Sequence, residues 1–447
     1  MKFDSFFRPD SVALIGASRF EGKVGNSIAK NLLKFKKVYF VNPAAKRILG
    51  RRSYASVLEI EQPVDLAVIA VKSDIVPNVL IECGEKAIRA AIIITAGFSE
   101  IGKLEAEQRL LEIAKRYNIR LLGPNCLGNI NPYAALNTTF TSIPVQKGAL
   151  AFVSQSGALC SAALDFALQK QIGFSGFASL GNMADVDFAD LVTYFDADPK
   201  TTAIILYIET LKNGAKFMQA ARRCRKPIIA IKAGISEAGA KAALTHTGSL
   251  AGSYAVYRAA FKQSDVIEAN SLTNAFDIAR FSSMKKRKIK KILIVSNAGG
   301  PAVLAADYSE SAGLNLAKLP KAMIAALNRV LPATWSKNNP IDIVGDADAQ
   351  RYKKVFDVLK SKEGRKGKNF YDCLICILTP QEMSQPFETA KALKHFAHFA
   401  KSNKVIACFL GGERIAKAKA FLIRNRISCF SELRRAFDVL AALRSTH

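Results

Sequence analysis

The chain has 447 residues, half of them hydrophobic, and its 64 Lys and Arg against 37 Asp and Glu give a formal net charge of +27. This much apolar content excludes a disordered chain. No apolar run approaches the ~20 residues of a membrane span, and charges interrupt the N-terminal MKFDSFFRPDS where a signal peptide would be apolar. We therefore expect a cytoplasmic protein without a membrane segment, divided into domains of ~150 residues each.

The first third of the sequence alternates short apolar runs with amphipathic stretches. The apolar runs that predict β-strands lie at residues 11–18, 37–43, 65–71, 90–97 and 119–125. Stretches of helical length, such as 25–35 and 103–117, lie between them. Strands and helices that alternate at this spacing predict a parallel, doubly wound sheet, and therefore an α/β fold.

The same alternation restarts twice. The second series has apolar runs at 148–157, 174–182, 202–210 and 226–234, with helices predicted over 158–171 and 187–195. The third has runs at 291–303, 372–380 and 404–412, followed by a terminal helix at 432–444. We expect three doubly wound domains, at residues 1–145, 146–286 and 287–447, with the basic run KKRKIKK at 285–291 as an interdomain linker.

The cysteines point to no metal or redox site. Only one CxxC pair occurs, Cys373 and Cys376, and it lies inside the apolar run DCLICIL. A zinc site would need a second pair of ligands, and a thioredoxin-type pair would need a helix N-terminus. We expect these two residues to be buried thiols of a strand, in a cytosolic protein that keeps its cysteines reduced.

The positive charge leaves several partners open. It attracts nucleic acid, but the lysines and arginines are spread along the chain without interleaved aromatic residues, which argues against a nucleic-acid site. A basic protein also attracts phosphorylated small molecules or an acidic partner subunit.

Small and polar residues follow the predicted strands of the first unit. In open α/β sheets, ligands bind at the carboxyl ends of the strands. The first turn, GASRFEGKVG, lets backbone amides approach a phosphate beside a lysine, although its spacing is not GxGxxG and a merely tight connection is the alternative. The residues predicted to bind a nucleotide-like ligand are Gly16, Ala17, Ser18, Lys23, Gly25, Asn42, Val71, Lys72, Thr95, Ala96, Gly97 and Asn125.

Three further motifs fall in the second unit. SQSG, with Ser154, Gln155, Ser156 and Gly157, joins a strand to a helix, where backbone amides and hydroxyls hold a phosphoryl group or Ser156 simply caps the helix. Glu209 ends the strand TAIILYIET as a surface glutamate or as the partner of a histidine. His246, in ALTHTGSLAG, has neither an apolar periodic context nor metal-ligand neighbours, so we interpret it as a nucleophile on a mobile loop.

Taken together and in order, these motifs resemble the α subunit of the ADP-forming (NDP-forming) acyl-CoA synthetases, the acetate–CoA ligases, whose relatives include succinyl-CoA synthetase. The resemblance covers nearly the whole chain, through VALIGAS, GKVG, VNP, TAGFSE, GPNCLG, SQSG, SLGNMADVD, YIET, THTGSLAG, SNAGGPAVLAAD, NPIDIVGDAD and LTPQ. It implies a Rossmann-like CoA-binding domain followed by two flavodoxin-like domains.

The resemblance also implies roles for the residues above. The strand-end residues of the first unit would bind CoA, residues 154–157 would hold phosphate, His246 would be phosphorylated and Glu209 would orient it. In the family, phosphate attacks acyl-CoA to give acyl phosphate and CoA, the histidine takes the phosphoryl group, and its loop carries that group to ADP. ADP or ATP and Mg²⁺ would bind an ATP-grasp β subunit in an α₂β₂ complex, because no ATP-grasp motif is recognisable here.

Two positions depart from the family pattern. Glu21 stands where a proline usually precedes GKVG, and Lys72 stands where a proline is common, so the affinity for CoA would differ. The acyl pocket is expected near Gly181 and Asn182. The alternative function is a non-catalytic CoA-binding or regulatory module of the same fold, which would have no reason to keep Glu209, His246 and SQSG together.

Overall fold

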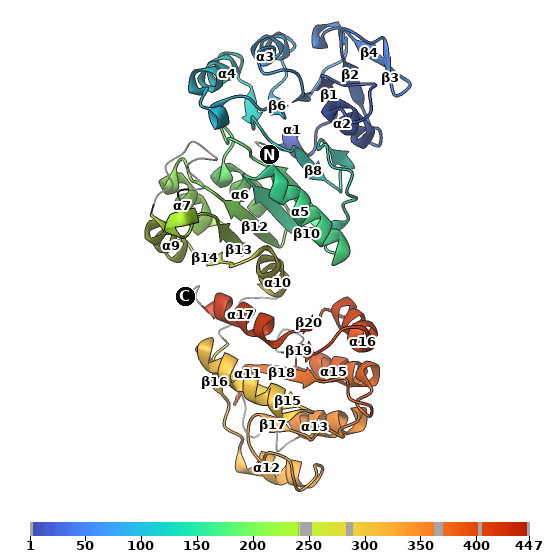
Figure 1. Cartoon of the computed structure of the whole chain (residues 1–447), viewed down its shortest axis with the longest axis vertical. Helices are drawn as coiled ribbons and strands as arrows, with labels where there is room; N and C mark the ends of the chain where they lie inside the picture. Colours follow the sequence, from blue (N-terminus) through green and yellow to red (C-terminus); the bar gives the residue numbers. More distant parts are fainter. Residues whose placement is uncertain are drawn as a thin grey trace. The chain divides into compact units, whose positions relative to one another are not determined.

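The structure is a computed structural model that describes residues 3–239, 241, 253–282, 289–361, 370–400 and 405–444. The chain divides into two compact units, Met1–Ala275 and Phe276–His447 (Figure 1). The described residues form three sheets with helices on their faces, which confirms the predicted α/β class. Within these residues, we find no helix of the length and apolarity that crossing a membrane requires.

The first sheet has the order β3-β4-β2-β1-β5-β6-β7. Its strands are Val12–Ile15 (β1), Val38–Val41 (β2), Arg47–Ile48 (β3), Arg51–Tyr54 (β4), Leu66–Ile69 (β5), Ala90–Ile93 (β6) and Arg120–Leu122 (β7). All neighbours pair in parallel except β3 and β4. The order reverses at β1, which pairs with both β2 and β5, and such a switch point leaves a crevice at the carboxyl ends of the strands.

The elements that cover this sheet are α2 (Val24–Leu32), η1 (Val57–Glu59), α3 (Val76–Glu85), η2 (Ser99–Ile101) and α4 (Leu104–Tyr117). Helix α4 shows why these residues form a helix. Acidic residues in its first turn and basic residues in its last turn complement the helix dipole. It ends at Asn118, which takes the left-handed conformation (φ 56°) typical of a helix C-terminus.

The second sheet has the order β14-β13-β12-β10-β11-β8-β9. Its strands are Asn129–Asn131 (β8), Leu136–Asn137 (β9), Lys147–Ser154 (β10), Phe174–Ser179 (β11), Ala203–Ile208 (β12), Ile228–Lys232 (β13) and Val266–Glu268 (β14). Its helices are α5 (Gly157–Gln169), α6 (Phe188–Ala197), α7 (Gly214–Arg223) and α9 (Tyr254–Gln263), and α10 (Leu272–Ser282) follows β14 and spans the division between the two units. Strands β8 and β9 precede residue 145, so this sheet takes in residues from before the proposed domain boundary.

The third sheet lies in the second unit and has the order β16-β15-β18-β19-β20, with β17 also paired to β15. Its strands are Lys291–Ser296 (β15), Asn315–Leu316 (β16), Ile341–Asp342 (β17), Cys373–Leu378 (β18), Val405–Phe409 (β19) and Ser428–Phe430 (β20). Its helices are α11 (Gly299–Ser311), α12 (Lys321–Asn328), α13 (Ala349–Lys360), α15 (Pro386–Ala400), α16 (Glu413–Arg424) and α17 (Leu433–Arg444). The prediction of buried strand thiols is confirmed, since Cys373 and Cys376 are both fully buried in β18.

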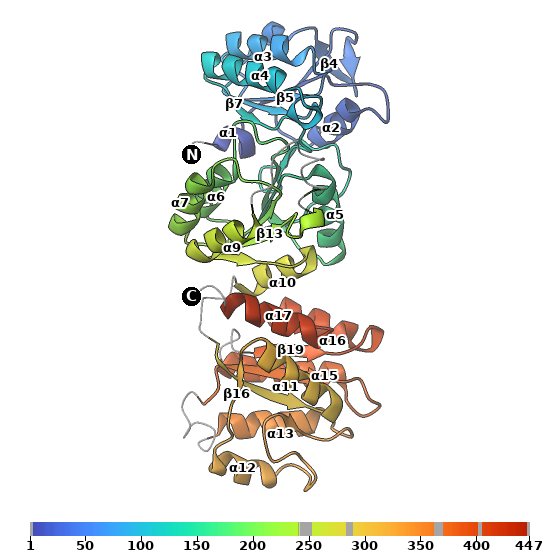
Figure 2. The same cartoon turned by 60° about the vertical axis from the view of Figure 1, so that its left-hand side comes forward.

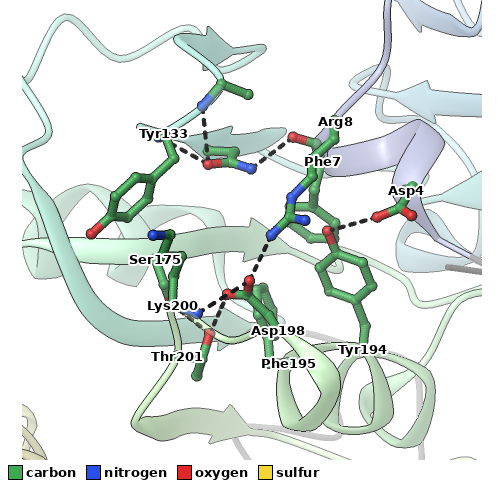
Figure 3. Close-up of polar contacts among 12 residues, drawn as sticks. Asp4, Phe7, Arg8, Tyr133, Ser175, Tyr194, Phe195, Asp198, Lys200 and Thr201 are labelled. Atoms are coloured by element: carbon green, nitrogen blue, oxygen red, sulfur yellow. Dashed lines mark hydrogen bonds and ion pairs between the residues drawn. The ribbon is translucent and has the colours of Figure 1, made fainter.

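The N-terminal segment ties the first two sheets together. Helix α1 (Asp4–Phe7) contacts both β6 and β8 and is visible between their sheets in Figure 2. The Phe7 ring stacks on Tyr194 at 4.7 Å, and the Asn131 side-chain amide donates to the Phe7 carbonyl oxygen at 2.9 Å. The Arg8 guanidinium donates to the buried Asp198 carboxylate at 2.6 Å (Figure 3). These contacts of Phe7 and Arg8 thus attach the chain to the second sheet and its helices before the chain enters β1.

We predict that Arg8→Met destabilises the first unit by ~1–2 kcal/mol, because it removes a charged hydrogen-bond donor from a buried carboxylate. Urea unfolding of the full chain measures the change. Lys36→Met is the matched control, since it removes an exposed ion pair with Asp10 and should change the unfolding free energy little. Equal effects of the two substitutions would contradict this account of the N-terminal segment.

Candidate functional site

The first unit contains a cavity of about 1060 Å³ where the carboxyl ends of the first two sheets meet. Val71, Thr95 and Asn125 reach it from the ends of β5, β6 and β7. Residues that follow β10, β11 and β12 form the opposite part of its lining. The predicted site residues that line it are Val71, Thr95, Ala96, Asn125, Gln155, Ser156, Gly157 and Glu209, together with Gly181 and Asn182 of the expected acyl pocket.

The glycines of the first turn allow α2 to pack closely on β1. Gly16 has φ +92°, and a Cβ placed on it would lie 2.3 Å from the Ala70 carbonyl oxygen. A Cβ on Gly25 would lie 2.0 Å from the Gly16 carbonyl oxygen. Only glycine fits such contacts, so the tight connection that the sequence left open does exist. Val24, the first residue of α2, nevertheless lines the cavity.

The other predicted residues of this edge shape its turns. The Asn42 amide donates to the Ala17 carbonyl oxygen at 2.7 Å, and the Ser18 hydroxyl accepts from the Phe20 amide at 3.1 Å. Lys23 is the N-cap residue of α2, and its side chain is exposed, as is that of Lys72. Asn42 and Ser18 therefore fix the turn after β1, whereas Lys23 and Lys72 are exposed and are not among the residues that line the cavity.

The loops after β6 and β7 are joined to each other and to β5. The Thr95 hydroxyl donates to the Val71 carbonyl oxygen at 2.7 Å, and the Asn125 amide N–H donates to the Thr95 carbonyl oxygen at 2.9 Å. Asn125 itself has a positive φ of 57°, which asparagine tolerates better than most residues. Gly97, also at positive φ, donates its amide to the Glu100 carboxylate. This edge of the cavity is thus a connected set of loops.

SQSG closes a tight turn at the start of α5. The Ser154 hydroxyl accepts from the Ser156 amide and donates to the Ser156 carbonyl oxygen, both at 3.0 Å. The Ser156 hydroxyl accepts from the Leu159 amide at 3.2 Å, so it caps the helix as the alternative interpretation expected. The Ser156 cap takes up only the Leu159 amide, whereas the first amides of any helix have no intrahelical acceptor. Gly157 and Ala158, the first two residues of α5, line the cavity. The two interpretations are therefore compatible.

Gln155 and Lys232 hold the backbone at Glu209 from two sides. The Gln155 side-chain oxygen accepts from the amides of Glu209 and Thr210, at 2.8 and 3.0 Å. The Lys232 ammonium donates to the Glu209 carbonyl oxygen at 2.8 Å. Gln155 and Lys232 are only 8% and 6% exposed, so these contacts are shielded from water.

Lys232 is a functional candidate that the sequence analysis missed. It ends β13, and burial lowers the pKa of its ammonium while the Glu209 carboxylate acts to raise it. The ammonium lies 4.5 Å from the centre of the Tyr257 ring, and the Tyr257 hydroxyl accepts from the Leu211 amide at 3.1 Å. The available signal was a single lysine at the end of the apolar run KPIIAIKAG.

His246 lies outside the described residues, as does most of the basic run at 285–291. The described chain nevertheless shows where the segment that bears His246 begins. Directly after β13, the Ala233 amide donates to the carbonyl oxygen of Ile208, the residue before Glu209. The chain therefore leaves β13 next to the residue that precedes Glu209. Among the described residues, no group of three His, Cys, Asp or Glu side chains is placed to hold a metal ion.

Comparison with known proteins adds the family. A family model described as a CoA binding domain matches residues 10–132, a succinyl-CoA ligase like flavodoxin domain matches 147–282, and a ligase-CoA domain matches 292–442. The chain is 41% identical to the α subunit of acetate–CoA ligase (ADP-forming) II from Pyrococcus furiosus, over 98% of this chain and 96% of that subunit. The chain belongs to the ADP-forming acetate–CoA ligase family. Within the succinyl-CoA synthetase superfamily it corresponds to the α subunit or α domain.

Other members of the ADP-forming acetate–CoA ligase family agree with this. Acetate–CoA ligase (ADP-forming) I from Archaeoglobus fulgidus is 42% identical over 98% of this chain, which spans only 63% of that protein. A solved structure, dinucleotide-forming acetyl-coenzyme A synthetase 1 of Ca. Korarchaeum cryptofilum in complex with phosphate and ADP, is 37% identical with a TM-score of 0.91. The match covers 100% of this chain and 97% of the synthetase chain.

In this acetate–CoA ligase family member, we predict that Gln155→Leu destabilises the first unit by ~1–3 kcal/mol, because two amides next to Glu209 lose a buried acceptor. Thermal and urea unfolding measure the loss. Gln219→Leu, on the exposed face of α7, is the control and should have a much smaller effect. If both variants unfold alike, the Gln155 contacts contribute nothing to the stability of the first unit.

Proposed function

We propose that the chain is the α subunit of an ADP-forming acyl-CoA synthetase that converts acyl-CoA, ADP and phosphate into the free acid, ATP and CoA. The observation that carries this proposal is the shared cavity. It brings four of the residues predicted to bind CoA into one space with three residues of SQSG and with Glu209: Val71, Thr95, Ala96, Asn125, Gln155, Ser156, Gly157 and Glu209. A protein that only sensed CoA would not need the second group of residues there.

The first step of the proposed reaction is attack by phosphate on the acyl-CoA carbonyl carbon. The C–S bond breaks, CoA leaves as a thiolate, and an acyl phosphate remains. The amides at the start of α5 suit a phosphoryl group, because a helix N-terminus combines free N–H donors with a positive dipole end. Lys23 and Lys72 supply positive charge at the ends of β1 and β5, where the CoA phosphates would bind.

In the second step, the His246 imidazole attacks the phosphorus atom, the acid leaves as a carboxylate, and a phosphohistidine forms. Glu209 would accept the second imidazole N–H and so leave the attacking nitrogen unprotonated. Two observations support this pairing: Gln155 and Lys232 fix the backbone of Glu209, and Ala233, directly after β13, bonds Ile208, the residue before Glu209.

We propose that the phosphoryl group then passes to ADP, with Mg²⁺, on an ATP-grasp β subunit. The P. furiosus relatives named as α subunits support a separate β subunit, since this chain spans 96% and 97% of their lengths. An α₂β₂ complex and a cytosolic location stay predictions. The high positive charge of the chain would suit an acidic surface on that partner.

The test is phosphorylation of the purified chain by labelled phosphate and a short acyl-CoA. We expect an acid-labile, base-stable label that is absent in His246→Ala. In Glu209→Gln, the rate of labelling should fall on the order of 10²-fold or more, because the histidine loses its orienting partner. His398→Ala, which changes an exposed histidine of α15, is the control and should be labelled normally.

The outcome also separates the two candidate functions. A chain that binds CoA but takes no label, alone or with a β subunit, would be the non-catalytic CoA-binding module. A label that survives in His246→Ala would reject His246 as the nucleophile. Release of CoA that depends on ADP and phosphate, seen only with the β subunit present, would complete the proposed reaction.

A further inference from the structure

Five polar residues, joined by hydrogen bonds and one ion pair, form one side of the cavity, which we call the carboxylate wall: Ser99, Glu100, Glu107, Asn182 and Lys212. Glu107 is its centre, with a side chain only 8% exposed. Its carboxylate accepts from the Ser99 hydroxyl at 2.6 Å and from the Asn182 amide at 2.8 Å, and it lies 3.6 Å from the Lys212 ammonium. The wall therefore joins α4 to the loops that follow β11 and β12.

The side-chain amide of Asn182 donates hydrogen bonds to two carboxylates. Its nitrogen also donates to Glu100 at 2.6 Å, while its oxygen accepts from the Asn125 amide at 3.2 Å, which fixes the orientation of the side chain. Partial burial acts to raise the pKa of Glu100, but hydrogen bonds from Asn182 and the backbone amides of Gly97 and Phe98 outweigh it and lower that pKa. Glu100 is thus ionised at neutral pH.

The lining of the cavity is therefore acidic on this side. Among the lining residues that the structure describes, Lys212 is the one cation, whereas Glu100, Glu107 and Glu209 are carboxylates. The Lys212 side chain is 46% exposed, so water screens its charge more than that of Glu107. Such a wall repels the phosphates of CoA. We therefore expect an uncharged part of the ligand to lie beside it.

Apolar side chains beside the wall favour the acyl end of the ligand. Ile101, Leu104 and Phe140 line the same cavity and are 60%, 63% and 40% exposed. Large apolar side chains left open in a cavity are typical of a binding surface for an apolar group. Together with the carboxylates, these side chains favour binding of an uncharged acyl chain and disfavour binding of an acyl chain that ends in a second carboxylate.

We propose that the carboxylate wall sets the acyl specificity of the site by rejecting acyl groups that carry negative charge, and that Glu107 is its principal specificity-determining residue. This inference rests on the proposed function, since it requires acyl-CoA to bind in the cavity.

The experiment compares binding of butyryl-CoA and succinyl-CoA, whose acyl groups both have four carbons and differ in a terminal carboxylate. Calorimetry on the full chain gives both dissociation constants, with free CoA as reference. We expect the wild type to bind butyryl-CoA at least tenfold more tightly than succinyl-CoA. Glu107→Gln should narrow this ratio by at least fivefold, and Glu100→Gln should narrow it as well. Glu105→Gln, an exposed carboxylate on the same helix, should leave the ratio as it is.

The outcomes separate this inference from the proposed function. If the wild type binds none of the three ligands, the CoA site itself is wrong. If it binds free CoA but shows no preference between the two thioesters, or if both Gln variants keep the wild-type ratio, the role of the wall is overturned. Should Glu107→Gln lose free CoA binding and melt at a lower temperature, Glu100→Gln decides the question.

Discussion

Parallel strands present their carboxyl ends at a single edge, and the first unit brings two such edges onto one cavity. Every predicted site residue that lines the cavity follows the end of a strand. The N-terminal segment maintains this arrangement, because α1 contacts both sheets and Arg8 reaches Asp198 in the second. The chemistry of the site therefore depends on tertiary contacts that lie well away from it.

A strand end is held in the same way in both units. In the second unit, the Ser296 hydroxyl accepts from the Ala298 amide and donates to its carbonyl oxygen, as Ser154 does with Ser156. Asn297 then bonds Thr379 at the end of β18, much as Gln155 bonds the residues after β12. In both units, a turn closed by a serine hydroxyl is thus followed by an amide side chain that bonds the end of the adjacent strand.

The sequence predicts those parts of the fold and of the site that depend on local patterns of residues. Apolar runs place the strands, so the strand ends, SQSG, Glu209 and the buried pair Cys373 and Cys376 follow from position alone. The carboxylate wall could not be found this way, because Glu107 meets Asn182 across 75 residues of sequence. Lys232 was missed for a related reason: a lysine at a strand end is usually exposed, and its burial comes from Tyr257 on a later helix. Pairing of β8 and β9 with the second sheet is equally non-local.

The charge of the whole chain and the charge of its cavity have opposite signs, and the two act at different distances. A net charge of +27 attracts polyanions such as CoA over many ångströms, independently of how they are oriented. In the proposed arrangement, the carboxylates inside the cavity act at contact distance and select the part of the ligand that lies beside them. A ligand with phosphates at one end and a neutral thioester at the other is then drawn in by the first field and aligned by the second. Under the proposed specificity, the long-range field brings the ligand to the chain, and the carboxylate wall then selects among acyl groups by their charge.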